Sequence, residues 1–243
     1  MVALVVGEPS AAVRAYATGC RKGASADACT RLESLFTQFD TGQVSPPSYR
    51  DAVETACEAG SLSGCRRLGL VHKSEGKFDE AAAVFERACK EGEADACSNL
   101  GNAHAKGQGR KEDLPMAVSL HRKACDGGSL FGCHNLGGMY FDGRGVKVDL
   151  QEAARLYAGG CQKGYMLSCR NLGLMTLDGA GVEHSDARAA ALLRTACDGG
   201  DGEACCTLAS LYSQKRIAPP SVAEATRVQA RGCELGVEPC CPQ

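Results

Sequence analysis

The sequence contains no tryptophan, and aromatic residues make up only 5% of its 243 residues. A folded core must therefore be built from Ala, Leu, Val and Cys and from close contacts at Gly, which suits helices that pack over small interfaces. No charge of one sign dominates, because 27 Lys and Arg residues stand against 29 Asp and Glu residues. This balance excludes a strongly basic face, so we expect no nucleic-acid partner.

Long apolar runs are also missing. The longest, "VALVV", extends from Val2 to Val6, has no basic region before it and stops at Gly7. It is far shorter than the roughly 20 residues of a membrane-spanning helix and does not match a signal peptide. We therefore expect no membrane insertion, and the sequence shows no targeting signal. A signal peptide that had already been cleaved would leave the same pattern.

Cysteine, in contrast, is abundant. Of the 16 cysteines, all but two recur in pairs, and every pair but the first has the spacing C-x7-C if Cys233 is matched with Cys241. The first members of successive pairs are 37, 32, 36, 36, 36 and 36 residues apart. Such a period indicates an array of repeats. The regular pairs are Cys20/Cys29, Cys57/Cys65, Cys89/Cys97, Cys125/Cys133, Cys161/Cys169, Cys197/Cys205 and Cys233/Cys241.

Each repeat reads as two helices. After the second cysteine comes a segment such as "NLGGMY", in which Leu136, Met139 and Tyr140 have helical spacing. A loop such as "DGRGV" follows, and then "DLQEAARLYAGG", where Asp149 and Glu152 form a capping-box pattern. The same helix start is predicted at Asp113, Ser185 and Ser221 in other units. The sequence therefore predicts an all-α protein built from helix hairpins.

The cysteine pairs are predicted to be structural disulfides across the turns between helices. Closing a loop of this size stabilises the fold by roughly 2.6 kcal/mol in the chain-entropy estimate. Structural zinc prefers tighter C-x2-4-C knuckles that bring four ligands to one point, and no C-x-x-C redox motif occurs. We therefore expect neither a metal nor a cofactor at the regular pairs.

Two cysteines, Cys206 and Cys240, fall outside the regular pattern. The favoured pairing joins Cys206 to Cys240 and ties the C-terminal tail to the preceding hairpin. Two alternatives stay open: a bond between Cys233 and Cys240, and a metal site made by four sulfur atoms. The sulfur ligands of that site would come from Cys205, Cys206, Cys240 and Cys241.

Units such as "CHNLGGMYFDGRGVKVDLQEAARLYAGGCQKG" resemble Sel1-like repeats, relatives of the tetratricopeptide repeat. The C-x7-C form is similar to the Helicobacter cysteine-rich proteins and to the mitochondrial cytochrome c oxidase assembly factor with Sel1 repeats. The resemblance implies a right-handed α/α solenoid with a concave face. Residues 1–243 would form one solenoid of about six hairpins and a truncated C-terminal unit. The unit at Cys57 departs from the pattern, because it lacks the Gly-x-Gly loop.

A comparison of the repeats separates constant from variable positions. A Leu-Gly pair and an Asn recur in the first helices and are expected to serve packing. The position after each second cysteine varies, as does the position one turn later, and on a solenoid these residues would form a stripe. That stripe is either a solvated surface or a partner-binding face. The candidate partner-binding residues are Arg66, Asn102, His134 and Arg170.

Evidence for catalysis is weak. His72 and His104 occupy the repeat position at which another unit has Tyr140. The two histidines are either packing substitutions for Tyr or ligands of a metal or haem. The segment "SEGK", from Ser74 to Lys77, fits the loose S-x-x-K pattern of penicillin-recognising enzymes without their other signatures. We therefore predict no enzyme, no catalytic residues and no cofactor.

The predicted function is a non-catalytic scaffold, adaptor or assembly subunit of a larger complex that binds a protein or peptide segment on its concave face. The alternatives are a penicillin-binding or β-lactamase-like protein and a redox or haem-handling factor for assembly of a respiratory complex. Because so many paired cysteines need oxidising conditions, we expect the mitochondrial intermembrane space or an extracytoplasmic location, periplasmic or secreted.

Overall fold

The computed structural model describes residues 9–20, 26–40, 49–219 and 221–241. Within these ranges the chain contains helices and no strand, which confirms the all-α prediction. The helices are α1 (Pro9–Cys20), α2 (Ala26–Asp40), α3 (Tyr49–Glu58), α4 (Leu62–Ser74), α5 (Phe78–Lys90), α6 (Ala94–Lys106), α7 (Leu114–Asp126), α8 (Leu130–Asp142), α9 (Leu150–Gln162), α10 (Met166–Asp178), α11 (Asp186–Asp198), α12 (Gly202–Ser213), α13 (Val222–Glu234) and the 3-10 helix η2 (Glu238–Cys240).

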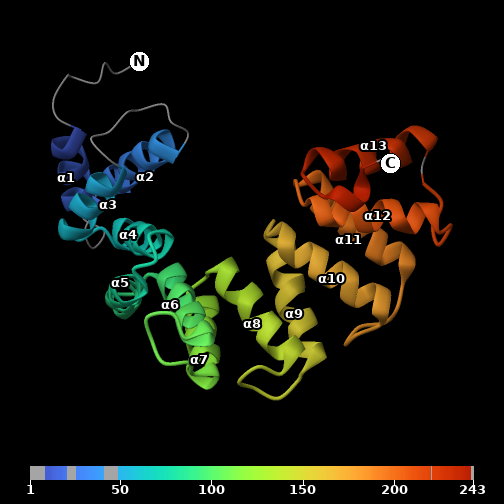
Figure 1. Ribbon diagram of the computed structural model, residues 1–243, viewed down its shortest axis with the longest axis horizontal. Coiled ribbons are helices and arrows are strands. Elements are labelled where there is room, and N and C mark those ends of the chain that lie inside the picture. Colours follow the sequence, from blue (N-terminus) through green and yellow to red (C-terminus); the bar gives the residue numbers. More distant parts are fainter. Residues whose placement is uncertain (1–8, 21–25, 41–48, 220, 242–243) are drawn as a thin grey trace. The chain divides into compact units, whose positions relative to one another are not determined.

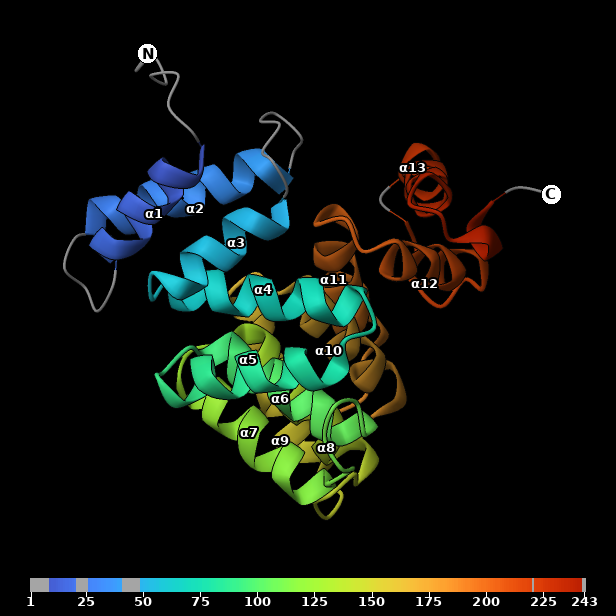
Figure 2. The same ribbon diagram turned by 60° about the vertical axis from the view of Figure 1, so that its left-hand side comes forward.

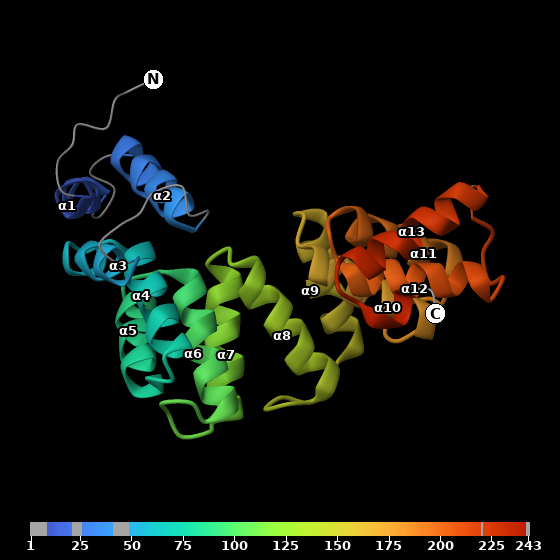
Figure 3. The same ribbon diagram turned by 45° about the horizontal axis from the view of Figure 1, so that its top comes forward.

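The helices divide into two compact units, residues 1–127 and 128–243. In unit 1, each helix from α3 to α6 packs on the next one, as Figure 2 shows, and α1 packs on both α2 and α3. In unit 2, α8 to α13 follow the same rule, and η2 packs on α12 and α13 (Figures 1 and 3). Each unit is thus a series of antiparallel hairpins. That all 243 residues form one solenoid stays a prediction.

Side-chain caps define where the second helix of each hairpin begins. Asp113, Asp149, Ser185 and Ser221 precede α7, α9, α11 and α13, and each accepts a hydrogen bond from a backbone N–H in the first turn. Such caps satisfy N–H groups that have no partner within the helix. The helix starts predicted from the sequence are therefore confirmed at all four residues.

The Gly-x-Gly loops serve two different purposes. The first glycine, Gly107, Gly143 or Gly179, ends α6, α8 or α10 in the left-handed conformation, with φ between 64° and 69°. The second glycine allows close backbone approach, because a Cβ at Gly109 would collide with the Phe78 carbonyl, and one at Gly181 with the Leu150 carbonyl. The loops at Gly109 and Gly181 therefore each rest on the start of a helix in the preceding repeat.

The recurring Leu-Gly pair is explained by packing within each hairpin. A Cβ at Gly137 would lie 2.9 Å from the Tyr157 ring, and one at Gly173 would lie 3.0 Å from Leu193. Gly69 and Gly101 face Phe85 and His121 in the same way. The glycine thus makes room for the one large side chain that the second helix places four residues before its cysteine. Small residues let the two helices approach closely, as the lack of aromatic residues required.

Disulfides join the end of each second helix to the start of the next hairpin. Five C-x7-C pairs are bonded, with Cα–Cα distances of 4.3 to 4.8 Å. Cys20, Cys125 and Cys133 are disulfide-bonded as well, and the side chain of Cys29 lies outside the described residues. The five bonds are Cys57–Cys65, Cys89–Cys97, Cys161–Cys169, Cys197–Cys205 and Cys233–Cys241.

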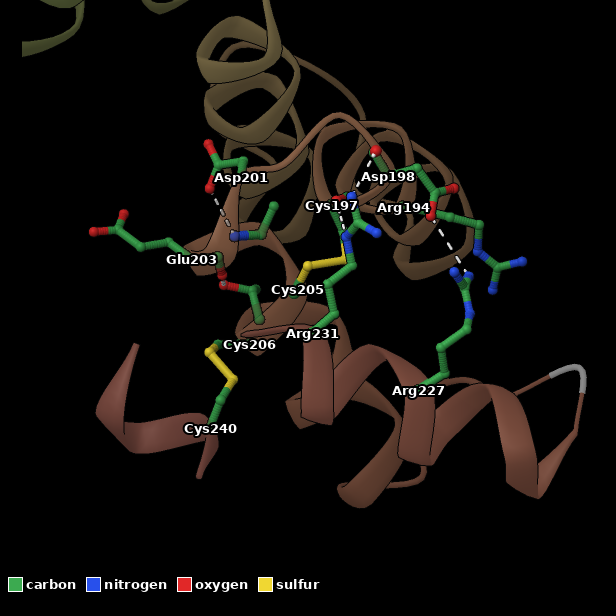
Figure 4. The surroundings of a disulfide bond; sticks show 12 residues. Arg194, Cys197, Asp198, Asp201, Glu203, Cys205, Cys206, Arg227, Arg231 and Cys240 are labelled. Carbon is green, nitrogen blue, oxygen red and sulfur yellow. Dashed lines mark hydrogen bonds and ion pairs between the residues drawn. A yellow bond between two sulfur atoms is a disulfide. The ribbon is translucent and has the colours of Figure 1, made fainter. Parts of the chain in front are cut away.

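The C-terminal tail is held by a bond between Cys206 and Cys240 (Figure 4), the favoured pairing of the sequence analysis. It fixes η2 against α12, while Gly232 of α13 leaves the space that the two sulfur atoms occupy. Arg231 donates to the carbonyl groups of Cys197 and Asp198 at the end of α11. The last hairpin is therefore closed by covalent and polar contacts.

We predict that Gly137→Ala destabilises unit 2 by about 1–3 kcal/mol, because its methyl group overpacks the contact with Tyr157. Gly138→Ala is the matched control, since its Cβ would meet only the Tyr157 hydroxyl, at 3.5 Å. It should be neutral or stabilising by up to about 1 kcal/mol through helix propensity. Urea unfolding without reductant measures both; equal losses would refute the packing role of the first glycine.

Candidate functional site

Unit 2 contains a groove between two first helices, α8 and α10. Its floor comes from α9, which lies between them in the sequence and packs on both (Figure 1). We call it the α8/α10 groove, and its volume is about 150 Å³. It is lined by Phe141, Tyr157, Asn171, Leu174, Met175 and Asp178.

The α8/α10 groove has a packed floor and apolar walls. Tyr157 and Met175 are 3% and 2% exposed, and the Asn171 side chain hydrogen-bonds to the Tyr157 hydroxyl. Phe141 of α8 and Leu174 of α10 stand at the walls, with 41% and 38% of their surfaces exposed. An exposed apolar pair above a packed floor is suited to receive an apolar side chain.

Negative charge lies at one end of the groove. Asp178 ends α10 and lines the groove, and Asp142 ends α8 beside Phe141. Burial is the main reason that the pKa of Tyr157 is raised, and the Asp142 charge raises it further. None of the six lining residues carries a positive charge. The groove therefore combines an apolar centre with an acidic end.

Unit 1 contains the equivalent groove between α4 and α6, with Phe85 in the place of Tyr157. Its volume is only about 10 Å³. When the repeats are aligned, Lys73 corresponds to Phe141, Asn102 to Leu174 and Lys106 to Asp178. The same architecture thus carries a small groove with Lys73 in its lining in one unit and a larger apolar groove with an acidic end in the other.

Three of the four predicted partner-binding residues make contacts between repeats. Arg66 pairs with Glu93 at 3.3 Å, His134 shares a 3.1 Å hydrogen bond with Ser168, and Arg170 pairs with Asp201 at 3.1 Å. Arg170 also contacts Glu203, at 2.6 Å. Each contact reaches the beginning of the next first helix. The position after the second cysteine therefore helps to stack repeats.

Asn102 is the fourth predicted residue, and it lines the unit 1 groove. Arg66 and Asn102 belong to unit 1, whereas His134 and Arg170 belong to unit 2 and lie within electrostatic reach of one another. Their role in partner binding stays a prediction. Phe141, Tyr157 and Asp178 were missed by the sequence analysis, although comparing the ends of the first helices, where Lys73 and Phe141 share a slot, offered a signal.

We predict that the Arg170–Asp201 pair is energetically coupled, because the Asp201 side chain is only 4% exposed. A double-mutant cycle with Arg170→Met and Asp201→Asn, read by urea unfolding, should give a coupling energy of about 1–3 kcal/mol. Asp201→Asn keeps a side chain able to cap α12. A coupling energy near zero would assign Arg170 to the solvated surface instead.

Two histidines are held neutral by burial. His121 is 1% exposed and shares a 3.0 Å hydrogen bond with Ser98, and burial lowers its pKa to about 4. His134 packs against Tyr157 and Tyr165, and burial, followed by the nearby charge of Arg170, lowers its pKa to about 4. Neither ring is available as a general base in an open site. Both serve packing.

We predict that acidification destabilises the protein through these histidines. A folded pKa of about 4, against 6.5 for the ordinary group, gives stability that is complete above pH 6.5 and lost as pH falls towards 4. The loss is about 3 kcal/mol for each histidine. In unit 1, His121→Leu with Ser98→Ala should remove the contribution of His121 to this pH dependence, and another repeat has Leu193 at the position of His121. Urea unfolding from pH 7 to 4 tests this, and an unchanged slope would contradict it.

The weaker sequence patterns do not converge on a site in the described residues. Ser74 donates to the Val71 carbonyl and Lys77 pairs with Glu75, so the two residues of the S-x-x-K pattern have separate partners. His104 donates to the Lys111 carbonyl. Across the described ranges no three His, Cys, Asp or Glu side chains are grouped to hold a metal ion. Among the same residues, none of the helices is long and apolar enough to cross a membrane.

Comparison with known proteins finds matches at the level of repeats and fold. The Sel1 repeat model matches residues 94–129, 130–165 and 167–201. A Sel1 repeat protein from Oxalobacter formigenes superposes with a TM-score of 0.74 and 25% identity, covering 86% of this chain and 90% of that one. No curated protein matches the sequence.

Two further structures are similar. The protein c5321, a protective antigen present in uropathogenic Escherichia coli strains, has an SLR fold, 22% identity and a TM-score of 0.68 over 94% of this chain. The chain spans only 53% of its length. Cysteine rich protein B of Helicobacter pylori is 28% identical and covers 53% of this chain and 92% of its own, with a TM-score of 0.44. That last superposition is too loose to support a structural argument.

Proposed function

We propose that this chain, which matches the Sel1 repeat at residues 94–129, 130–165 and 167–201, is a non-catalytic scaffold that binds a segment of another protein in the α8/α10 groove. Proteins with Sel1 repeats generally mediate protein–protein interactions. The observation that carries the proposal is the exposed pair Phe141 and Leu174, which faces a pocket that the chain itself does not fill.

The groove is built to keep its shape when it binds. Its floor is packed and hydrogen-bonded, and the helices that carry its walls are capped at Ser129 and fixed by the Cys161–Cys169 disulfide. A preformed site loses little conformational entropy on binding. The groove is therefore suited to binding a flexible segment, which would supply the ordering itself.

The disulfides indicate an oxidising compartment. We propose an extracytoplasmic location, which agrees with the bacterial sources of the similar structures. A partner in such a compartment would meet the chain in its oxidised, stapled form. Binding assays should accordingly be made without reductant.

We predict that peptides selected from a random library against the oxidised protein bind in this groove. Phe141→Lys with Leu174→Asn introduces the unit 1 residues of the same slots, Lys73 and Asn102, so the fold should tolerate them. This variant should bind at least ten-fold more weakly, a loss of about 1.4 kcal/mol. Fluorescence anisotropy with the selected peptides measures the effect.

The control for this experiment is Val222→Asn. It removes a more exposed apolar side chain, 83% exposed, from the start of α13 in the same unit. Its affinity should equal that of the unaltered protein. Selected peptides that bind the groove variant as tightly as the unaltered chain would refute the groove as the binding site.

A further inference from the structure

We propose that the α8/α10 groove selects a segment in which an apolar residue and a Lys or Arg lie two positions apart. The inference rests on the proposed function and adds the chemistry of the partner. The apolar side chain would enter between Phe141 and Leu174, and the basic side chain would reach Asp178.

The volume and lining of the pocket fit one apolar side chain. About 150 Å³ is the size of an apolar cavity that holds a benzene ring. Aromatic and aliphatic carbon surrounds this space on three sides, from Phe141, Tyr157 and Leu174. A Phe or Leu side chain of the partner would bury the two exposed walls of the groove.

The charges near the pocket favour a cation beside that side chain. Asp178 is exposed and ends α10, where the helix dipole adds partial negative charge. Arg216 lies within electrostatic reach of Asp178, but both oxygens of Asp186 already accept hydrogen bonds from its guanidinium group. The acidic end of the groove is thus left to attract a basic group from a partner.

Helix geometry sets the spacing within the partner. Asn171, Leu174 and Asp178 share one face of α10, and Leu174 and Asp178 are about 6 Å apart along the axis at 1.5 Å per residue. An extended segment advances about 3.3 Å per residue, and its alternate side chains point to the same side. Two residues therefore cover the distance and present both side chains to α10.

The unit 1 groove is an internal comparison. Lys73 and Lys106 replace Phe141 and Asp178, and the volume falls to about 10 Å³. A groove of that size and charge should reject the apolar-basic segment. The two grooves differ in volume and charge although the helices around them are alike. This difference indicates that the residues at these repeat positions determine which segment each groove binds.

The test uses the oxidised full chain and three acetylated, amidated peptides in a Gly-Ser background, containing Phe-Ser-Arg, Phe-Ser-Glu or Ala-Ser-Arg. Backbone amide shifts in ¹H–¹⁵N spectra, with peptide up to millimolar concentration, give affinity and location together. Phe-Ser-Arg should bind at least ten-fold tighter than the other two peptides and shift the amides of Leu174 and Asp178.

Asp178→Lys should reverse the preference towards Phe-Ser-Glu, and Lys106 shows that the repeat accommodates Lys in this slot. Glu234→Lys makes the same change in charge at the exposed end of α13 and should leave the preference unchanged.

Binding of Phe-Ser-Glu as tightly as Phe-Ser-Arg in the groove would overturn the inferred selectivity and leave the proposed function standing. Binding of Phe-Ser-Arg that shifts amides elsewhere, with none at Leu174 and Asp178, would overturn the inferred site. Lack of binding by all three peptides, while library-selected peptides still bind the groove, would overturn the apolar-basic motif alone.

Discussion

Disulfide bonds across the turns between hairpins hold together the small helix interfaces of each unit. A chain with 5% aromatic residues and no tryptophan packs its helices largely through Ala, Leu and Gly, so each interface is small. Linking residues eight positions apart restricts the unfolded chain and ties the end of one hairpin to the start of the next. Helices held in this way can leave Phe141 and Leu174 exposed without collapsing around them.

Much of the fold could be predicted because it repeats. The 36-residue period predicted the hairpins, and the capping residues Asp149 and Ser185 predicted helix starts. The regular C-x7-C spacing predicted the disulfides between hairpins. The Leu-Gly pair was expected to serve packing, and Gly137 against Tyr157 shows how it does so. These features are local in sequence, so a single chain reveals them.

The site was harder to predict because its contacts join residues that are far apart in the sequence. The variable stripe appeared to be a candidate surface, but Arg66, His134 and Arg170 reach the next repeat. Sequence patterns do not distinguish a contact between repeats from a contact with a partner, because both kinds of contact use the same types of residue. The groove depends on Phe141, Tyr157 and Leu174 from three helices, and repeat periodicity does not show which of their faces meet.

The disulfide bonds between hairpins are tested most directly by mass spectrometry of the folded, unreduced chain after treatment with a thiol-alkylating reagent. We expect no alkylated cysteine, peptides linked between cysteines eight positions apart, such as Cys161 and Cys169, and a link between Cys206 and Cys240. Quantitative alkylation of the folded chain, or links that join other partners, would contradict this expectation.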